Sequence, residues 1–153
     1  MSKREEILDM AVHALTPLMA ARPLANAADL FDASVEIAEK LIARVDVTAQ
    51  IAGAPDRDEL LDMGVHAMSA LLRGRPSSSV DDLLDECMDV AQRLIGAVDA
   101  ANAGDDDARE ELLDMAVHAQ TAFLSTRPPM DAGDLSAQCV EIARSLTAKV
   151  DSA

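Results

Sequence analysis

The chain has 153 residues, and the 50% that are hydrophobic are enough for the core of one domain. It has no Trp or Tyr and only two Phe, so the core has to be built from smaller aliphatic side chains. The net charge is −15, from 28 acidic and 13 basic residues. A surface of this sign opposes direct binding to nucleic acid and to anionic membranes, but it is compatible with a basic protein partner.

The two cysteines, Cys87 and Cys139, are too few for a disulfide framework, and their spacing matches no zinc-binding motif. No apolar run reaches the length of a membrane span, and residues 1–6 are not followed by the apolar stretch of a signal peptide. We therefore expect a cytoplasmic protein that binds no cofactor and no membrane.

One segment of the sequence occurs three times. It reads REEILDMAVHA from Arg4, RDELLDMGVHA from Arg57 and REELLDMAVHA from Arg109. The three copies then align without a gap as far as Asp46, Asp99 and Asp151. Similarity over such a length indicates an internal repeat. We predict one domain over residues 1–153, made of repeats at 3–46, 56–99 and 108–151.

Each copy contains two stretches with apolar residues at helical spacing, separated by an Arg-Pro pair at 22–23, 75–76 and 127–128. Proline disfavours helix in the residue before it, so the first helix of each copy should end near the arginine. Pro17 lies inside the first helix, where we expect a kink or an early frayed turn. The pattern predicts an all-α fold of three tandem helical hairpins, with six helices.

Two arrangements of the hairpins are open: a compact pseudo-threefold bundle or a short α-array. Stacked repeat proteins usually have a polar capping repeat at each end, and neither the first nor the last copy has this character. This, with the close similarity of the copies, slightly favours the compact bundle.

The charged ends of the repeat predict ion pairs within each hairpin. In an antiparallel hairpin the start of the first helix lies beside the end of the second. An arginine at a helix start and an aspartate at a helix end are each unfavourable next to the helix dipole, and pairing offsets this. The expected pairs are Arg4 with Asp46, Arg57 with Asp99, and Arg109 with Asp151.

Cys87 and Cys139 occupy the same repeat position as Ser34, at the centre of the apolar stripe of the second helix. A small residue at this position is typical of helices that approach each other closely. We interpret both thiols as buried and inert, not as redox groups.

One polar pair is identical in all copies and lies on the side of the helix opposite the apolar stripe, with Glu6, Glu59 and Glu111 beside it. The aspartate and the histidine are four residues apart and therefore share a helix face. These candidate site residues are Asp9, His13, Asp62, His66, Asp114 and His118.

Three interpretations of this pair are open. The face could contact the next hairpin or another chain, with the aspartate orienting the histidine. It could be an ordinary solvated pair. It could also be a metal site, because a carboxylate and an imidazole at this spacing can reach one ion, although the second histidine of HExxH is absent.

No nucleophile, phosphate-binding loop or pair of buried carboxylates accompanies these residues, so the sequence does not indicate an enzyme. The preferred function is a non-catalytic protein–protein interaction, in which the acidic faces engage a basic partner. One form of it is inhibition of a partner that normally binds nucleic acid. The alternative is a metal-binding helical protein that uses the repeated Asp–His pairs. Homo-oligomerisation is left open.

Overall fold

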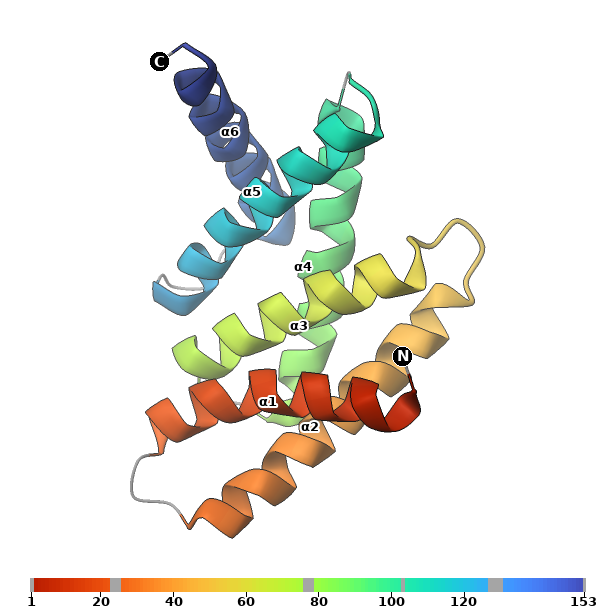
Figure 1. The fold of residues 1–153 in the computed structure, drawn as a ribbon, viewed down its shortest axis with the longest axis vertical. Helices are drawn as coiled ribbons and strands as arrows, with labels where there is room; N and C mark the ends of the chain where they lie inside the picture. The colour runs from red at the N-terminus through yellow and green to blue at the C-terminus, as the bar shows by residue number, and fades with distance from the viewer. Residues whose placement is uncertain (1, 23–25, 76–78, 103, 127–130, 153) are drawn as a thin grey trace.

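The computed structural model describes residues 2–22, 26–75, 79–102, 104–126 and 131–152. These residues form six helices and no strand, in the predicted three hairpins (Figure 1). Within the described residues, no helix is both long and apolar enough to cross a membrane. The helices are α1 (Lys3–Ala21), α2 (Ala27–Ala49), α3 (Arg57–Gly74), α4 (Val80–Ala101), α5 (Asp106–Thr126) and α6 (Ala132–Asp151).

The three hairpins stack in chain order. In Figure 1, α1, α3 and α5 lie side by side as one layer, with α2, α4 and α6 in a second layer behind them. The first helix of each hairpin contacts the first helix of the next, and α4 also packs extensively on α6. Among the described residues, no helix of the first hairpin contacts a helix of the third. A closed pseudo-threefold bundle would require that contact. The structure therefore has the short α-array, which corrects the preference for the bundle.

The helix boundaries follow local sequence signals. Ser2 and Glu5 form a capping box at the start of α1, in which each side chain binds the backbone N–H of the other residue. Asp56, Ser79 and Asp131 cap α3, α4 and α6 by accepting hydrogen bonds from backbone N–H groups of the first turn. The capping residues thus stand where the repeat pattern predicts that helices begin.

The first helices of the first two hairpins end just before the arginine of the Arg-Pro pair, as predicted. The last residue of α1 is Ala21 and that of α3 is Gly74. The expected early frayed turn at Pro17 is wrong, because α1 continues through this residue to Ala21, whereas a kink there stays a prediction. The three prolines of these pairs and Arg127 lie outside the described residues.

The core runs through the whole array and is densest in the middle hairpin. Leu60, Leu71, Leu84 and Leu94 are among its fully buried side chains. The packing includes a close backbone approach at Gly74, where an added Cβ would lie 2.6 Å from the carbonyl oxygen of Leu124. The hairpins therefore share one core instead of enclosing three separate ones.

Three polar side chains of the described ranges are buried in this core, and Ser34 and Ser136 each donate to a backbone carbonyl four residues earlier, whereas Gln120 differs. Gln120 is 2% exposed, and its Oε1 atom has no hydrogen-bond partner among the described residues. The equivalent residues of the other copies are Leu15 and Met68. We expect Gln120→Met to raise the free energy of unfolding by about 1–3 kcal/mol, because it removes an unsatisfied buried acceptor. Urea unfolding measures this, with the exposed Gln138→Met as the control; equal stability of the two variants would contradict the prediction.

Candidate functional site

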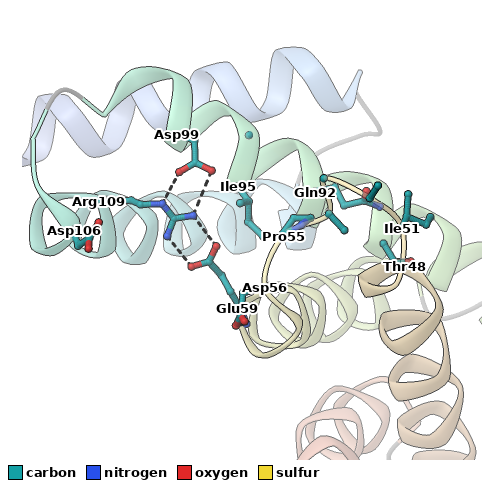
Figure 2. A pocket seen from close by; sticks show the side chains of 14 residues that line it. Thr48, Ile51, Pro55, Asp56, Glu59, Gln92, Ile95, Asp99, Asp106 and Arg109 are labelled. Carbon is teal, nitrogen blue, oxygen red and sulfur yellow. Dashed lines mark hydrogen bonds and ion pairs between the residues drawn. The ribbon is translucent and has the colours of Figure 1, made fainter.

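Two arginines link consecutive hairpins. The Arg57 guanidinium donates to Asp46 at the end of α2 (Nε to Oδ1, 2.6 Å) and to both carboxylate oxygens of Glu6 on α1 (3.0 and 2.6 Å). Arg109 repeats the arrangement one hairpin later: it donates to both oxygens of Glu59, each at 2.7 Å, and to Asp99 (Figure 2). We call each set an arginine clasp.

The predicted pairing is wrong by one repeat, because each aspartate binds the arginine of the next hairpin and not that of its own. Asp46 binds Arg57 instead of Arg4, and Asp99 binds Arg109 instead of Arg57. The physical reason is the direction of the helix face. Arg57 lies four residues before Leu61, whose side chain is buried between hairpins, so the arginine also points toward the preceding hairpin.

The clasps also reassign the glutamates that the sequence placed beside the Asp–His face. The side chains of Glu6 and Glu59 are only 15% and 22% exposed, and each accepts a bidentate pair of hydrogen bonds. The hydrogen bonds from Arg57 lower the pKa of Glu6, although desolvation opposes the shift. These glutamates therefore join neighbouring hairpins and do not belong to the outward face.

The Asp–His pairs have one geometry in all three copies. The Nδ1 atom of His13 lies 2.8 Å from the backbone carbonyl oxygen of Asp9, and the corresponding distances for His66 and His118 are both 2.7 Å. Because a carbonyl oxygen only accepts, Nδ1 carries the proton of the neutral ring. The Nε2 atom has no hydrogen bond within the described part of the chain and is available as an acceptor.

These pairs remain open to solvent. The side chains of His13, His66 and His118 are 44%, 37% and 70% exposed, and those of the paired aspartates are 47%, 61% and 62% exposed. None of the three histidines is therefore buried against a neighbouring hairpin. Each pair lies on a different helix of the α1, α3 and α5 layer, one per hairpin.

The pairs belong to a larger repeating pattern on the same helices. Four residues before each aspartate stands another exposed acid: Glu5, Asp58 and Glu110. Three residues after each histidine stands a hydroxyl: Thr16, Ser69 and Thr121. We call the surface formed by the acids, aspartates and histidines the acid–histidine face. Packing does not explain its repetition, because its side chains are not buried.

The geometry of the described residues does not support the interpretation as a metal site. Over the described ranges, no three or more His, Cys, Asp or Glu side chains are grouped so that they could hold a metal ion. The candidates Asp9, His13, Asp62, His66, Asp114 and His118 remain three separate pairs on three helices.

A surface groove that the sequence did not indicate lies beside the second clasp (Figure 2). It has a volume of about 710 Å³, between the linker at residues 50–55 and the helices α3, α4 and α5. Arg109 lines it, but its donors are already bound to Asp99 and Glu59. The other lining residues include no Ser, Cys or His that could act as a nucleophile or base.

The prediction that both cysteines are buried is confirmed, since Cys87 and Cys139 are 0% exposed. Burial raises the pKa of Cys139 from 9.0 to about 11, because a thiolate is poorly solvated there. That shift lowers the thiolate fraction at neutral pH by about 100-fold. We therefore expect a thiol reagent to label the folded protein at least that much more slowly than the urea-unfolded chain.

The raised thiol pKa also predicts a dependence of stability on pH. The unfolded thiol ionises near pH 9.0 and the folded Cys139 thiol only near 11. Stability from this group is present below pH 9.0 and is lost as the pH rises toward 11. In the labelling experiment described above, fast labelling of the folded protein at neutral pH would contradict the assignment of the thiols as buried.

No protein-family model, no curated protein and no solved structure matches this chain. Its function is therefore inferred from its residues and their geometry.

Proposed function

We propose that the protein acts without catalysis, by binding a basic protein partner through the acid–histidine face. The observation that carries the proposal is the repetition of the same exposed chemistry on α1, α3 and α5. Each helix presents an acid, an aspartate and a histidine in one order and register. A stacked array places such rows at regular intervals, which suits an extended partner surface.

The chemistry of the face indicates the kind of partner. The carboxylates accept hydrogen bonds from Lys and Arg side chains, and the free Nε2 atoms add neutral acceptors. The net charge of −15 favours encounter with a basic surface and disfavours direct nucleic-acid binding. A partner whose basic surface grips DNA or RNA fits this face, and occupying that surface would inhibit it.

The other layer is also acidic, but several of its acids have local structural roles. Asp29, Asp82 and Asp134 lie in the first turns of α2, α4 and α6, where the helix dipole favours an anion. Glu36 and Asp89 pair with the basic residue four positions later. The aspartates of the acid–histidine face lie beyond the first turn, so the helix dipole does not explain them, and their partner four positions later is a histidine instead of a Lys or Arg.

A Lys/Arg-rich peptide labelled with a fluorophore is a suitable probe, with binding followed by anisotropy. The test variant carries Asp9→Asn, Asp62→Asn and Asp114→Asn. The matched control removes three charges from one column of the other layer, by Glu36→Gln, Asp89→Asn and Glu141→Gln. The two variants have the same net charge, so a difference in affinity reports on the position of the charges. We expect the first variant to bind at least about 10-fold more weakly than the control.

The salt dependence gives a second readout. Binding through exposed charges should weaken steeply as the ionic strength rises, because the Debye length shortens. Equal losses in the two triple variants would mean that diffuse charge and not this face attracts the peptide. Salt-insensitive binding would also contradict the proposal.

A further inference from the structure

The two ends of the array carry most of its exposed apolar side chains. Of the ten large hydrophobic side chains that are exposed within the described residues, eight lie on the first or the last hairpin, at positions that are buried in the middle hairpin. The front face, on α1 and α2, consists of Leu8, Val12, Met19, Phe31 and Val35. The rear face, on α6, consists of Ile142, Leu146 and Val150.

The front face is apolar because its positions form interfaces in the other copies. Leu8 is 59% exposed, but its equivalents Leu61 and Leu113 are 6% and 5% exposed. The same contrast holds along α1. Val12 is exposed whereas Val65 and Val117 are buried, and Met19 is exposed whereas Leu72 and Leu124 are buried.

On the rear face the exposed residues belong to the third hairpin, and their buried equivalents belong to the first two hairpins. Leu146 is 51% exposed, whereas its equivalents Leu41 and Leu94 are both 0% exposed. Ile142 and Val150 are likewise exposed, although Ile37 and Val45 in the first hairpin and Val90 and Val98 in the second are buried. The third hairpin therefore presents a surface that the first two hairpins bury.

The internal interfaces show what covers such a surface. A Cβ added to Gly64 on α3 would lie 3.5 Å from Cδ1 of Leu41 on α2, so the rear position of one hairpin packs on the next hairpin. The equivalents of these two residues are Ala11 at the front of the array and Leu146 at its rear. The rear face of one molecule thus matches the front face of another in the manner already used twice within the chain.

The charges at the two ends are complementary as well. Arg4 is the equivalent of Arg57 and Arg109, but it makes no ion pair within the described residues. At the other end Glu111 and Asp151 are the equivalents of the clasp acids Glu59 and Asp99, and they too make none. Each end therefore holds the half of an arginine clasp that the other end lacks.

A second charge pair follows the same logic. Arg44 on α2 pairs with Asp85 on α4 across the first internal interface. The equivalents are Lys149 at the rear of the array and Asp32 at its front, both exposed and both without an ion pair within the described residues. Joining a rear face to a front face would bring these two residues together.

We propose that the chain assembles head to tail, with the rear face of one copy covering the front face of the next. The contact is heterologous, because it joins two different surfaces, so each added copy presents a fresh free end. The assembly continues the stacking of the α-array across molecules, with Arg4 of one copy clasped by Glu111 and Asp151 of its neighbour. It leaves the acid–histidine face uncovered and does not depend on the proposed function.

Sedimentation velocity across a range of concentrations tests the assembly. For the unaltered chain we expect the mean mass to rise with concentration beyond that of a dimer. Leu8→Glu and Leu146→Glu each block one end, and both should remain monomeric alone. The control Val47→Glu introduces the same charge at an exposed position that belongs to neither face and should assemble normally.

Mixing the two blocked variants separates this proposal from symmetric dimerisation. The Leu8→Glu variant keeps an intact rear face and the Leu146→Glu variant an intact front face, so an equal mixture should form heterodimers and nothing larger. Circular dichroism should show that both variants are folded, since both positions are exposed. A monomeric wild-type chain at all concentrations, or a dimer formed by either blocked variant alone, would overturn the proposal.

The charges at the interface provide an independent check. Arg4→Glu should abolish or strongly weaken assembly, since it places a third acid beside Glu111 and Asp151. Adding Glu111→Arg to the same chain should restore assembly in part, because the opposite charges meet again. A double variant that assembles no better than Arg4→Glu would contradict the predicted clasp between copies.

Discussion

Truncation of Leu94 to alanine is expected to lower the free energy of unfolding by about 2–5 kcal/mol. The side chain is 0% exposed at the centre of the array, so the substitution loses apolar burial and leaves a cavity. Leu41→Ala should have a similar effect, since Leu41 is also 0% exposed and faces the next hairpin. Equilibrium urea unfolding, followed by circular dichroism, measures both changes.

Leu146→Ala is the matched control, because it makes the same substitution at the same repeat position. The side chain is 51% exposed at the end of the array, and we expect a change within about 0.5 kcal/mol for dilute, monomeric protein. A large loss of stability at Leu146 under these conditions, or a small one at Leu94, would show that the hairpins do not stack as described.

Removal of a clasp arginine is expected to have the second largest effect. Arg109→Met should lower the free energy of unfolding by about 1.5–3 kcal/mol, since it leaves the half-buried Glu59 without its charged donors. Arg57→Met should lower the free energy of unfolding in the same way, because it leaves Glu6 without its charged donors. The methionine keeps much of the aliphatic side chain, so the loss reports mainly on the guanidinium. Urea unfolding at moderate ionic strength measures both variants.

Arg4→Met serves as the control for the clasps. Arg4 occupies the same repeat position but has no ion pair within the described residues, so we expect a change within about 0.5 kcal/mol. Equal losses for the three variants would mean that the clasps contribute nothing beyond general charge.

The clasp also predicts a dependence on pH. The hydrogen bonds from Arg57 hold the pKa of Glu6 below its ordinary 4.5. The contribution of this carboxylate is therefore complete above pH 4.5 and is lost as the pH falls through the lower pKa of the folded state. The stability difference between the wild type and Arg57→Met should shrink over that acidic range.

The sequence predicted the local structure well because its signals are local. Apolar residues at helical spacing and Arg-Pro pairs act within a few residues, and the structure has the six helices that they predict. The burial of Cys87 and Cys139 was also predictable, since both lie at the centre of an apolar stripe.

The partners of the clasps were not predictable in the same way. The sequence shows that every copy has an equivalent of Arg57 and of Asp46. A repeat pattern does not distinguish a contact within one hairpin from the same contact between neighbouring hairpins. Only the direction of the α3 face decides this, and it turns Arg57 toward Glu6 and Asp46 of the preceding hairpin.

By itself, then, the sequence determined the helices, the three hairpins and the repeated Asp–His pairs, because each depends on spacing along one chain segment. The tertiary structure decided that the hairpins form an open array, since closure depends on contacts between the helices of the first and third hairpins, and the described residues make none. It also decided which equivalent residues of the repeat are buried and which are exposed. Leu41, Leu94 and Leu146 are one position in the repeat, and only stacking leaves the last of them exposed.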